Sequence, residues 1–442
     1  MKQQALNQNE QSELQHIRIG LLGLGTVGTG VYRMIEDYQE DLQHKTGCQI
    51  SISKILVNSP NKLRSIEINP DLYTTDPNEV LQDPNIDMIV EVMGGVEEAR
   101  EYITHALKSK KHVVTANKDL IALYGGELLS LAGEQNCDLF YEASVAGGIP
   151  ILRGLGDGFS SDRITKMLGI LNGTTNYMLS KMAQEGVDYD TCLKEAQDLG
   201  YAEADPTSDV EGLDAARKVA ILGTLGYNTQ FSLDEVDVQG ISSIDQKDVQ
   251  YGREFGYELK LLGIADKQDE EVELSVQPTF IKKSHPIANV DGVNNAVYVH
   301  GESVGETMFY GPGAGELPTA TAVTSDLVTV VKNIKLGVNG RGNVAPFNVK
   351  KMKPKERRNH RYYVRLLVQD EPGVMATIAN SLAENNMSIS NMVQKPYSDE
   401  KAELVIVTHE VSLAALEDWK DKINALNPTL ELASCYAVEG GE

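Results

Sequence analysis

A glycine-rich turn between a strand pattern and a helix pattern constrains the fold of this chain more than any other feature. Residues 16–22 form a β-rich run, HIRIGLL, that leads directly into GLGTVG at residues 23–28. Apolar residues at helical spacing follow from Val31 to Tyr38, and a second strand is predicted from Ile50 to Val57. This strand–turn–helix–strand order predicts a Rossmann-type doubly wound α/β domain that binds a dinucleotide.

If the glycine-rich turn binds a dinucleotide, its residues have different roles. Gly23, Gly25 and Gly28 permit a tight turn and let the backbone approach a pyrophosphate. Thr26 and Val27 stand at the helix start, where free amides would meet the negative charge. The alternative is a tight βα turn that holds no ligand.

The end of the second strand bears on which dinucleotide binds. An acidic residue there would bind the ribose 2′-hydroxyl of NAD, but the strand runs into the neutral Asn58. The cations Lys62 and Arg64 follow and would tolerate a 2′-phosphate. We therefore expect NADP, or use of both NADP and NAD, although both cations could also belong to a solvated loop.

Two further buried strands are predicted in the same domain. The run from Ile86 to Val92 precedes a helix at Glu97 to Lys108, and HVVTANK follows at residues 112–118. Because the carboxyl ends of such strands line the ligand crevice, we expect Thr115 and Lys118 near the nicotinamide. A surface lysine is the alternative for Lys118.

Composition excludes several classes of protein. The 442 residues, 41% of them hydrophobic, suffice for two or three domains, and a net charge of −24 argues against nucleic-acid binding. The four cysteines lack CxxC spacing, no apolar run approaches the roughly 20 residues that span a bilayer, and residues 1–16 form a polar tail without the apolar centre of a signal peptide. We expect a cytoplasmic protein without a membrane segment.

An acidic stretch at residues 200–218, GYAEADPTSDVEGLDAARK, carries the candidate chemistry. Its second half has the composition of a helix, on which Asp214 and Lys218 share a face at i and i+4. Carboxylates beside a lysine suit a small cationic molecule with a carbonyl group. An exposed ion pair is the alternative.

A small-residue loop, YEASVAGGIP, lies at residues 141–150. Its carbonyl groups, together with Glu142, could enclose a monovalent cation. From the residues alone, tight packing is the simpler explanation.

The C-terminal part of the chain predicts a separate module. Residues 336–355 contain glycine, proline and lysine with little periodicity and are predicted to be a linker. From Arg361 a βαββαβ order follows within about 80 residues, which is the ferredoxin-like arrangement. Truncation after Lys355 is accordingly expected to keep catalysis.

Several long motifs occur in a characteristic order. GLGTVG, VVTANK, YEASVAGGIPI, GILNGTTNYML and the acidic stretch resemble the homoserine dehydrogenase family over residues 16–340. DEPGV at 370–374 and ISNM at 389–392 resemble an ACT domain. The resemblance implies reversible NAD(P)H-dependent reduction of L-aspartate 4-semialdehyde to L-homoserine, in threonine, methionine and isoleucine biosynthesis. No kinase segment precedes these motifs, so a monofunctional enzyme is expected.

The resemblance also implies roles for individual residues. Lys218 matches the proton donor to the aldehyde oxygen, and Lys118 matches a second lysine near the cofactor and the substrate. Glu203 and Asp214 match the carboxylates that hold the substrate. The positions matching a sodium site are Glu142, Val145, Gly147 and Ile149, and those matching cofactor-contacting glycines are Gly200 and Gly315.

The ACT resemblance implies an amino-acid effector, with L-threonine expected, and a homodimer or homotetramer. A module used only for dimerisation is the alternative. The expected domains are a tail at 1–16, a nucleotide domain at 17–150 with a returning helix at 316–340, an α+β substrate and dimerisation domain at 151–315, a linker at 341–360 and the ACT domain at 361–442.

Two other functions remain open from the residues. Another NAD(P)-linked amino acid dehydrogenase would explain the glycine-rich turn but not the ordered motifs. A non-catalytic amino acid sensor would be expected to lack the lysines, yet Lys118 and Lys218 are both present.

Overall fold

The computed structural model describes residues 14–341 and 345–440, which divide into two compact units. The first unit comprises residues up to 160 together with 224–232 and 311–348, and the second comprises 161–223, 233–310 and 349 onward. Most of the expected polar tail, residues 1–13, lies outside the described residues, as do 342–344 of the expected linker and 441–442.

The first unit is built on a parallel sheet, for which the described residues give the order β3-β2-β1-β4-β5-β6. This is the Rossmann strand order, and it confirms the doubly wound fold predicted from the glycine-rich turn. The strands are β1 His16–Leu22, β2 Gln49–Leu56, β3 Tyr73–Thr74, β4 Met88–Glu91, β5 His112–Thr115 and β6 Leu139–Phe140.

Helices cover both faces of this sheet, because alternate strand residues point to opposite sides. Ile19 and Leu21 of β1 belong to one apolar cluster, whereas Leu22 belongs to another. The helices are α1 Thr26–Asp37, α2 Gln39–Thr46, α3 Asn78–Leu81, α4 Glu97–Lys108, α5 Lys118–Gln135, α6 Ile151–Arg153 and α12 Glu316–Leu336.

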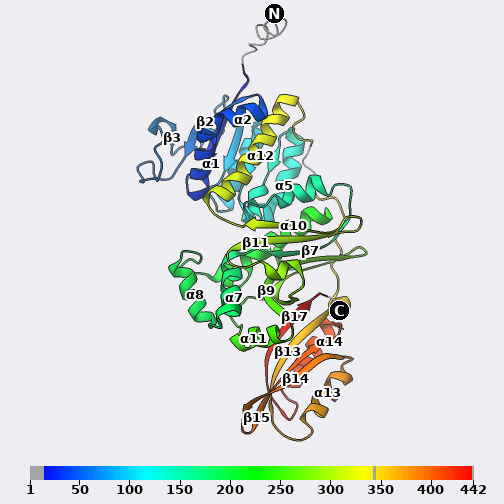
Figure 1. Cartoon of the computed structure of the whole chain (residues 1–442). Coiled ribbons are helices and arrows are strands. Elements are labelled where there is room, and N and C mark those ends of the chain that lie inside the picture. The colour runs from blue at the N-terminus through cyan, green and yellow to red at the C-terminus, as the bar shows by residue number, and fades with distance from the viewer. Residues whose placement is uncertain (1–13, 342–344, 441–442) are drawn as a thin grey trace, which may run out of the picture. The chain divides into compact units, whose positions relative to one another are not determined.

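Helix α12 is separated from the rest of the nucleotide-binding fold in sequence but packs directly on α1 (Figure 1). The contact is close because Gly30 leaves room: a Cβ there would lie 2.8 Å from the carbonyl oxygen of Glu316. Helix α12 therefore belongs to the first unit, while the expected domain bounds stay a prediction.

The second unit contains a larger, mainly antiparallel sheet. Among the described residues its path is β12-β11-β7-β9-β10-β17-β13-β15-β14. Its first part comprises β7 Ile164–Ile170, β8 Asp237–Val238, β9 Tyr257–Gln268, β10 Glu271–Lys282, β11 Asn294–Gly301 and β12 Gly305–Pro312. Its helices are α7 Gly173–Glu185, α8 Tyr189–Asp198, α9 Thr207–Val210, α10 Leu213–Tyr227, which ends in the first unit, and α11 Gln246–Glu254.

The C-terminal module has the predicted βαββαβ order. Its elements are β13 Asn359–Gln369, α13 Val374–Glu384, β14 Ile389–Ser398, β15 Lys401–Thr408, β16 Val411–Ser412, α14 Leu413–Ile423 and β17 Thr429–Glu439. Trp419 and Ile378 of its helices are fully buried in one apolar cluster with Leu366 and Leu404 of the strands. The ferredoxin-like arrangement is confirmed.

The module is joined to the preceding strands by backbone pairing, which the sequence did not predict. Strand β17 runs parallel to β10, with Thr279 opposite Ala437 and Ile281 opposite Glu439. Part of the expected linker is also anchored, because the amide of Lys353 donates to the carbonyl oxygen of Val272 at 2.9 Å. One sheet therefore continues through both parts of the second unit.

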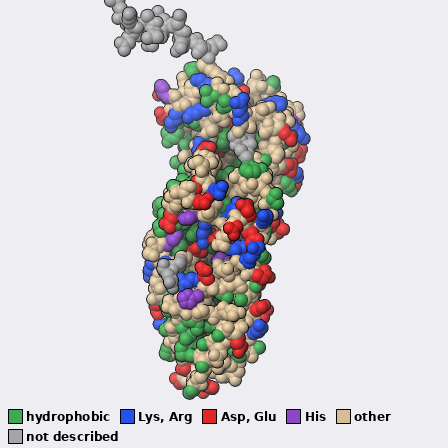
Figure 2. All heavy atoms as spheres, turned by 90° about the vertical axis from the view of Figure 1, so that its right-hand side faces the viewer, with side chains coloured by type: hydrophobic (Ala, Val, Ile, Leu, Met, Phe, Trp, Pro, Cys, Tyr) green, Lys and Arg blue, Asp and Glu red, His purple; other side chains and the backbone are tan. Residues whose placement is uncertain are grey.

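Three further observations concern the thiols, one face of the surface and the helices. The four cysteines, all within the described residues, are free thiols. On the face shown in Figure 2, acidic and basic side chains are interspersed. Among the helices of the described residues, none combines the length and apolar character required to cross a bilayer.

Candidate active site

The glycine-rich turn has the geometry that its sequence predicts. Gly23 has φ +98°, and a Cβ there would lie 2.8 Å from the Cα of Met93. A Cβ at Gly28 would lie 2.4 Å from the carbonyl oxygen of Gly23, so this glycine is needed for the close approach of helix and strand. At Gly25, by contrast, no atom of the described residues beyond its chain neighbours lies within 4 Å of such a Cβ. Gly25 therefore leaves open space beside the backbone.

The start of α1 suits an anion. Gly25 is the N-cap, and within the described residues no side chain caps the helix. The first-turn amides of Thr26, Val27 and Gly28 are left for another acceptor, in the manner of a pyrophosphate site. Thr26 is exposed and Val27 half-buried, so the turn remains accessible. The turn therefore fits a dinucleotide.

A buried carboxyl group that was not predicted from the sequence connects the ends of two strands. Glu91 ends β4 and is fully buried; its Oε2 accepts from Thr115 Oγ1 at 2.6 Å and its Oε1 from the amide of Met93 at 2.9 Å. Burial raises the pKa of Glu91, and these hydrogen bonds oppose the rise. An acidic residue inside the apolar run IDMIVEV was the available signal.

Two predicted cofactor residues, Thr115 and Lys118, lie at the end of β5 and at the start of α5. The hydroxyl group of Thr115 is buried and bound to Glu91, so its side chain supports the strand ends. Asn117 caps α5 by accepting from the amide of Leu120 at 3.1 Å. Lys118 is the first residue of α5 and is half-buried. Its position after β5 agrees with the predicted one, while its contact with a cofactor stays a prediction.

The loop after β2 holds the two cations predicted to favour NADP. Arg64 donates to the carbonyl oxygens of Ser59, Pro60 and Lys62, each at 3.0 Å. Its guanidinium also lies 4.8 Å from the ring centre of Tyr73. Lys62 is exposed. Arg64 therefore organises its own loop, and whether it also meets a 2′-phosphate or belongs to a solvated loop stays a prediction.

The predicted cation loop is buried and rigidly held. Glu142 accepts from the amides of Leu152 and Arg153 at 2.9 and 2.7 Å, and its own amide donates to Asp326 at 2.8 Å. Arg153 binds the other oxygen of Asp326 at 2.7 Å. Burial raises the pKa of Asp326 to about 7. Glu142 and Arg153, near the two ends of the predicted loop, thus both bind Asp326 of α12, which lies far away in sequence.

The loop itself bends at Ala146 and Gly147, both with left-handed φ. A Cβ at Gly147 would lie 2.4 Å from the carbonyl oxygen of Gly313, so only glycine fits. Val145 and Ile149 are buried. Over the described part of the chain, no cluster of three or more His, Cys, Asp or Glu side chains is arranged around a possible metal ion. A cation here would have to bind main-chain carbonyl oxygens, which suit a hard ion.

In the second unit, Lys218 and Asp214 share a face of α10 as predicted. The Nζ of Lys218 lies 2.8 Å from Oδ2 of Asp214 and 2.6 Å from the carbonyl oxygen of Leu171. Asp214 is only 4% exposed, so this is not the exposed ion pair of the alternative interpretation. Within the described residues, two of the three ammonium N–H groups are thus occupied, and the role of Lys218 towards a substrate stays a prediction.

A second residue at this cluster was not predicted. Asn172 follows β7 and caps α7; its Nδ2 donates to Asp214 Oδ2 at 2.9 Å and to Asp209 Oδ1 at 2.7 Å. The available signal was an Asn immediately after a buried strand and before a helical run, which is an N-cap pattern. Its partners, about 40 residues later, could not be predicted from spacing.

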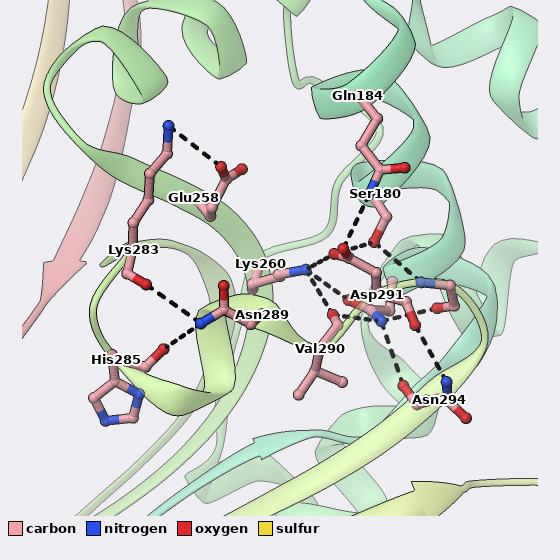
Figure 3. A network of polar contacts seen from close by, with 12 residues as sticks. Ser180, Gln184, Glu258, Lys260, Lys283, His285, Asn289, Val290, Asp291 and Asn294 are labelled. Carbon is pink, nitrogen blue, oxygen red and sulfur yellow. Dashed lines mark hydrogen bonds and ion pairs between the residues drawn. The ribbon is translucent and has the colours of Figure 1, made fainter.

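Helix α7 is held in place by the network shown in Figure 3. The amide group of Asn176 donates to the carbonyl oxygens of Val290 and Gly292 at 3.1 and 2.8 Å. Lys260 on β9 is buried, and its Nζ donates to Val290 at 2.7 Å and to Asp291 at 3.0 Å. Burial lowers the pKa of Lys260, and the nearby Asp291 opposes that shift. The loop before β11 is thereby fixed to the first turns of α7.

Three other predicted residues lie at exposed turns. Glu203 is exposed, and its carbonyl oxygen accepts from Gln197 Nε2 at 3.1 Å. Gly200, with φ +75°, ends the turn after α8, and Gly315, with φ +123°, is the N-cap of α12. Both glycines are required by the backbone conformation. Their contacts with a cofactor, and that of Glu203 with a substrate, stay predictions.

Comparison with known proteins identifies the family. Family models match in order along the chain: the NAD binding domain of homoserine dehydrogenase at 23–142, homoserine dehydrogenase at 150–328 and the ACT domain at 362–427. A homoserine dehydrogenase of Bacillus subtilis is 52% identical over 97% of this chain and 99% of that protein. The chain belongs to the homoserine dehydrogenase family. This dehydrogenase is therefore an NAD(P)-dependent oxidoreductase with a C-terminal ACT domain.

Other relatives agree with that assignment. A homoserine dehydrogenase of Neisseria gonorrhoeae is 42% identical over 90% of this chain and 92% of its own length. The crystal structure of a homoserine dehydrogenase from Thiobacillus denitrificans matches with a TM-score of 0.91 and 40% identity over 96% of this chain and 99% of that one. A hyperthermophilic archaeal homoserine dehydrogenase in complex with NADPH matches with a TM-score of 0.61 and 27% identity over 72% of this chain and 98% of that one. The resemblance inferred from the motifs is confirmed, and the sensor interpretation is set aside.

Proposed function

We propose that this dehydrogenase reversibly reduces L-aspartate 4-semialdehyde to L-homoserine with NADPH or NADH, as a step towards threonine, methionine and isoleucine. The observation that carries the proposal is the fixed ammonium group of Lys218, which has donors bound to Leu171 and Asp214 and, among the residues that the structure describes, one donor left. The bound cofactor supplies the hydride. As charge develops on the aldehyde oxygen, Lys218 stabilises it and gives up the proton from Nζ.

The other end of the substrate carries an α-ammonium group and requires an anion. We assign this part of the site to Glu203 and Asp214, with Lys118 near the cofactor. Asp214 supports the assignment because its buried carboxylate is already held by Asn172 and Lys218, so its position is fixed before substrate arrives. Glu203 is exposed and would be ordered by the substrate.

For the cofactor we propose NADP, with NAD as a second substrate. The absence of an acid at Asn58, which follows β2, supports this choice, and so does the archaeal relative solved with NADPH. Gly23, Gly25 and the first turn of α1 would hold the pyrophosphate, with Lys62 and Arg64 beside the adenosine ribose, Thr115 and Lys118 towards the nicotinamide, and Gly200 and Gly315 as further contacts.

We also propose a monovalent cation, such as Na⁺, at residues 142–149. The donor set would be main-chain oxygens of Glu142, Val145, Gly147 and Ile149. The left-handed turn at Ala146 and Gly147 supports it, since such a bend turns successive carbonyl groups away from a regular ladder. Activity measured in sodium, potassium and a bulky organic cation would test this assignment.

The ACT domain is proposed to bind an amino-acid effector, L-threonine in the first instance, within a homodimer or homotetramer. ACT-type pairing along sheet edges supports the oligomer, and β14 is the last strand on its side of the sheet. The chain is proposed to act in the cytoplasm, which its free thiols support.

A steady-state assay of the purified full chain tests the proposal. Aspartate semialdehyde is offered with NADPH and with NADH, and cofactor oxidation is followed by absorbance with and without L-threonine. We expect turnover with both cofactors. No oxidation with either cofactor, across pH and salt, would contradict the proposed reaction.

A further inference from the structure

The junction between β7 and α7 holds Lys218 through two successive residues. Leu171 offers its carbonyl oxygen to the ammonium at 2.6 Å, and Asn172 offers its side-chain amide to the carboxylate that binds the same ammonium. The direction of the remaining N–H of Lys218 therefore depends on where Asp214 Oδ2 is held.

The orientation of the Asn172 amide group follows from its neighbours. Its Oδ1 accepts from the backbone amide of Thr175 at 2.9 Å and from the Thr175 hydroxyl at 3.1 Å. A backbone N–H can only donate, so the atom facing Thr175 must be the oxygen. The NH₂ group consequently faces Asp214 and Asp209, at 2.9 and 2.7 Å. Asn172 is 6% exposed, so water does not readily replace these contacts.

Chemically, the amide group is the only part of Asn172 that can bridge two carboxylates. It donates one N–H to each and adds no charge, whereas a carboxylate at this position would repel both. The cap of α7 uses only the oxygen, which Ser or Asp could also supply. Capping and bridging are thus separate functions of one side chain.

We infer that Asn172 is a positioning residue for catalysis, which fixes the Asp214 carboxylate and through it aims the Lys218 ammonium at the substrate oxygen. This inference rests on the proposed role of Lys218. Asn172 does not touch the reacting atoms itself. Because small displacements of a catalytic group lower rates steeply, loss of the bridge is expected to reduce kcat roughly 10- to 100-fold.

Three variants separate the two functions in the full-length enzyme. Asn172→Ser keeps a capping oxygen and loses the bridge, Asn172→Asp keeps the cap and the shape but turns the donor into an acceptor, and Asn172→Ala loses both. Asp188→Ala is the matched control, because Asp188 caps α8 by accepting from Thr191 at 2.9 Å and is exposed. The control is expected to lower Tm and leave kcat unchanged.

For Asn172→Ser we expect a Tm near that of the wild type, a reduced kcat and an unchanged KM for NADPH. For Asn172→Asp we expect a new pH dependence. Two nearby carboxylates raise the pKa of the introduced carboxyl group, and only its protonated form can donate to Asp214. Activity should therefore be highest at acidic pH and fall as pH rises, unlike the wild type.

The inference is overturned if Asn172→Ser retains the wild-type kcat, or if its Tm falls as far as that of Asn172→Ala. It is also overturned if the pH profile of Asn172→Asp matches the wild type. Lys218→Ala distinguishes failure of the proposed role of Lys218 from failure of the inferred role of Asn172. If that variant remains active, the proposed role of Lys218 fails; if it is inactive while Asn172→Ser is unaffected, only the role of Asn172 fails.

Discussion

The ammonium of Lys218 lies 2.8 Å from the carboxylate of Asp214, one helical turn away on α10, and both side chains are largely buried. An exposed pair at this spacing would contribute only about 0.2–0.5 kcal/mol. Burial raises the cost of breaking the pair, because loss of either charge would leave the other buried without its partner. The pair therefore serves to hold a charged lysine at a fixed place.

We expect Lys218→Ala to abolish most turnover while cofactor binding remains. Loss of one electrostatic donor to a developing oxyanion typically raises the barrier by about 2.7–4 kcal/mol, or roughly 10²- to 10³-fold in kcat. Stopped-flow turnover and fluorescence titration of NADPH measure the two effects. Lys267→Ala, which breaks a pair with Glu270 at 3.7 Å, is the control. A near-normal rate for Lys218→Ala would refute the role.

Two glycines of the β1–α1 turn should respond differently to alanine. Gly28→Ala places a Cβ 2.4 Å from the carbonyl oxygen of Gly23, so we expect a lower Tm and weak NADPH binding. Gly25→Ala meets open space, so we expect an unchanged Tm without ligand but a raised Kd for NADPH. Thermal denaturation and titration distinguish them. Unimpaired binding by Gly25→Ala would show that no ligand approaches there.

Cofactor preference is expected to favour NADPH at least as much as NADH, because no acid follows β2. Arg64→Ala removes three hydrogen bonds within its loop and should raise KM for both cofactors. If the guanidinium also meets the 2′-phosphate, the increase should be larger for NADPH. The measurement is kcat/KM of the wild type and of Arg64→Ala with each cofactor. Equal losses with NADPH and NADH would show that Arg64 has only a structural role.

A buried ion network links α11 to the C-terminal module, and its removal should destabilise the fold. Arg365 binds Asp248 at 2.7 Å and Glu403 at 2.8 Å, and all three side chains are buried. Arg365→Met leaves the buried Asp248 without this cation and Glu403 with Lys247 alone, and breaking a buried pair typically costs about 3–5 kcal/mol. Arg357→Met, which breaks an exposed pair with Glu271, should cost about 1 kcal/mol or less. Chemical denaturation compares them, and equal costs would contradict the prediction.

The same network predicts a loss of stability in acid. Burial alone would raise the pKa of Glu403, but hydrogen bonds from Tyr251, Lys247 and Arg365 outweigh it and hold the pKa below its ordinary value. The unfolded state then binds the proton more readily, so this contribution to stability is present above the unfolded-state pKa of Glu403 and disappears as pH falls through the lower folded-state pKa. Glu403→Gln should flatten the unfolding free energy over that acidic range. Identical slopes for variant and wild type would exclude the linkage.

The anchoring of the C-terminal module changes one expectation. From the sequence, truncation after Lys355 is expected to keep catalysis, because a linker precedes a self-contained βαββαβ pattern. In the structure β17 pairs with β10, and Arg365 neutralises Asp248 of α11. Truncation would expose the edge of β10. It would also leave the buried carboxylate of Asp248 without its cation. Point variants in the effector module are therefore the better test of regulation.

The sequence by itself determined the features that depend on neighbouring residues. The β1–GLGTVG–α1 order, the helix at Glu97–Lys108, the shared face of Asp214 and Lys218 and the βαββαβ order all follow from local periodicity and from glycine at fixed spacing. The family resemblance added the reaction class. Each of these rests on residues within a few turns or strands of one another, where spacing dictates geometry.

Only the tertiary structure decided which distant groups meet. The bond from Thr115 to Glu91 spans 24 residues, that from Asn172 to Asp214 spans 42, and that from Arg365 to Asp248 spans 117. No repeat period encodes such pairs, because a polar side chain can be buried only where folding brings a complementary partner within hydrogen-bond distance. Packing, rather than pattern, therefore determined how Lys218 is held and how the C-terminal module is attached.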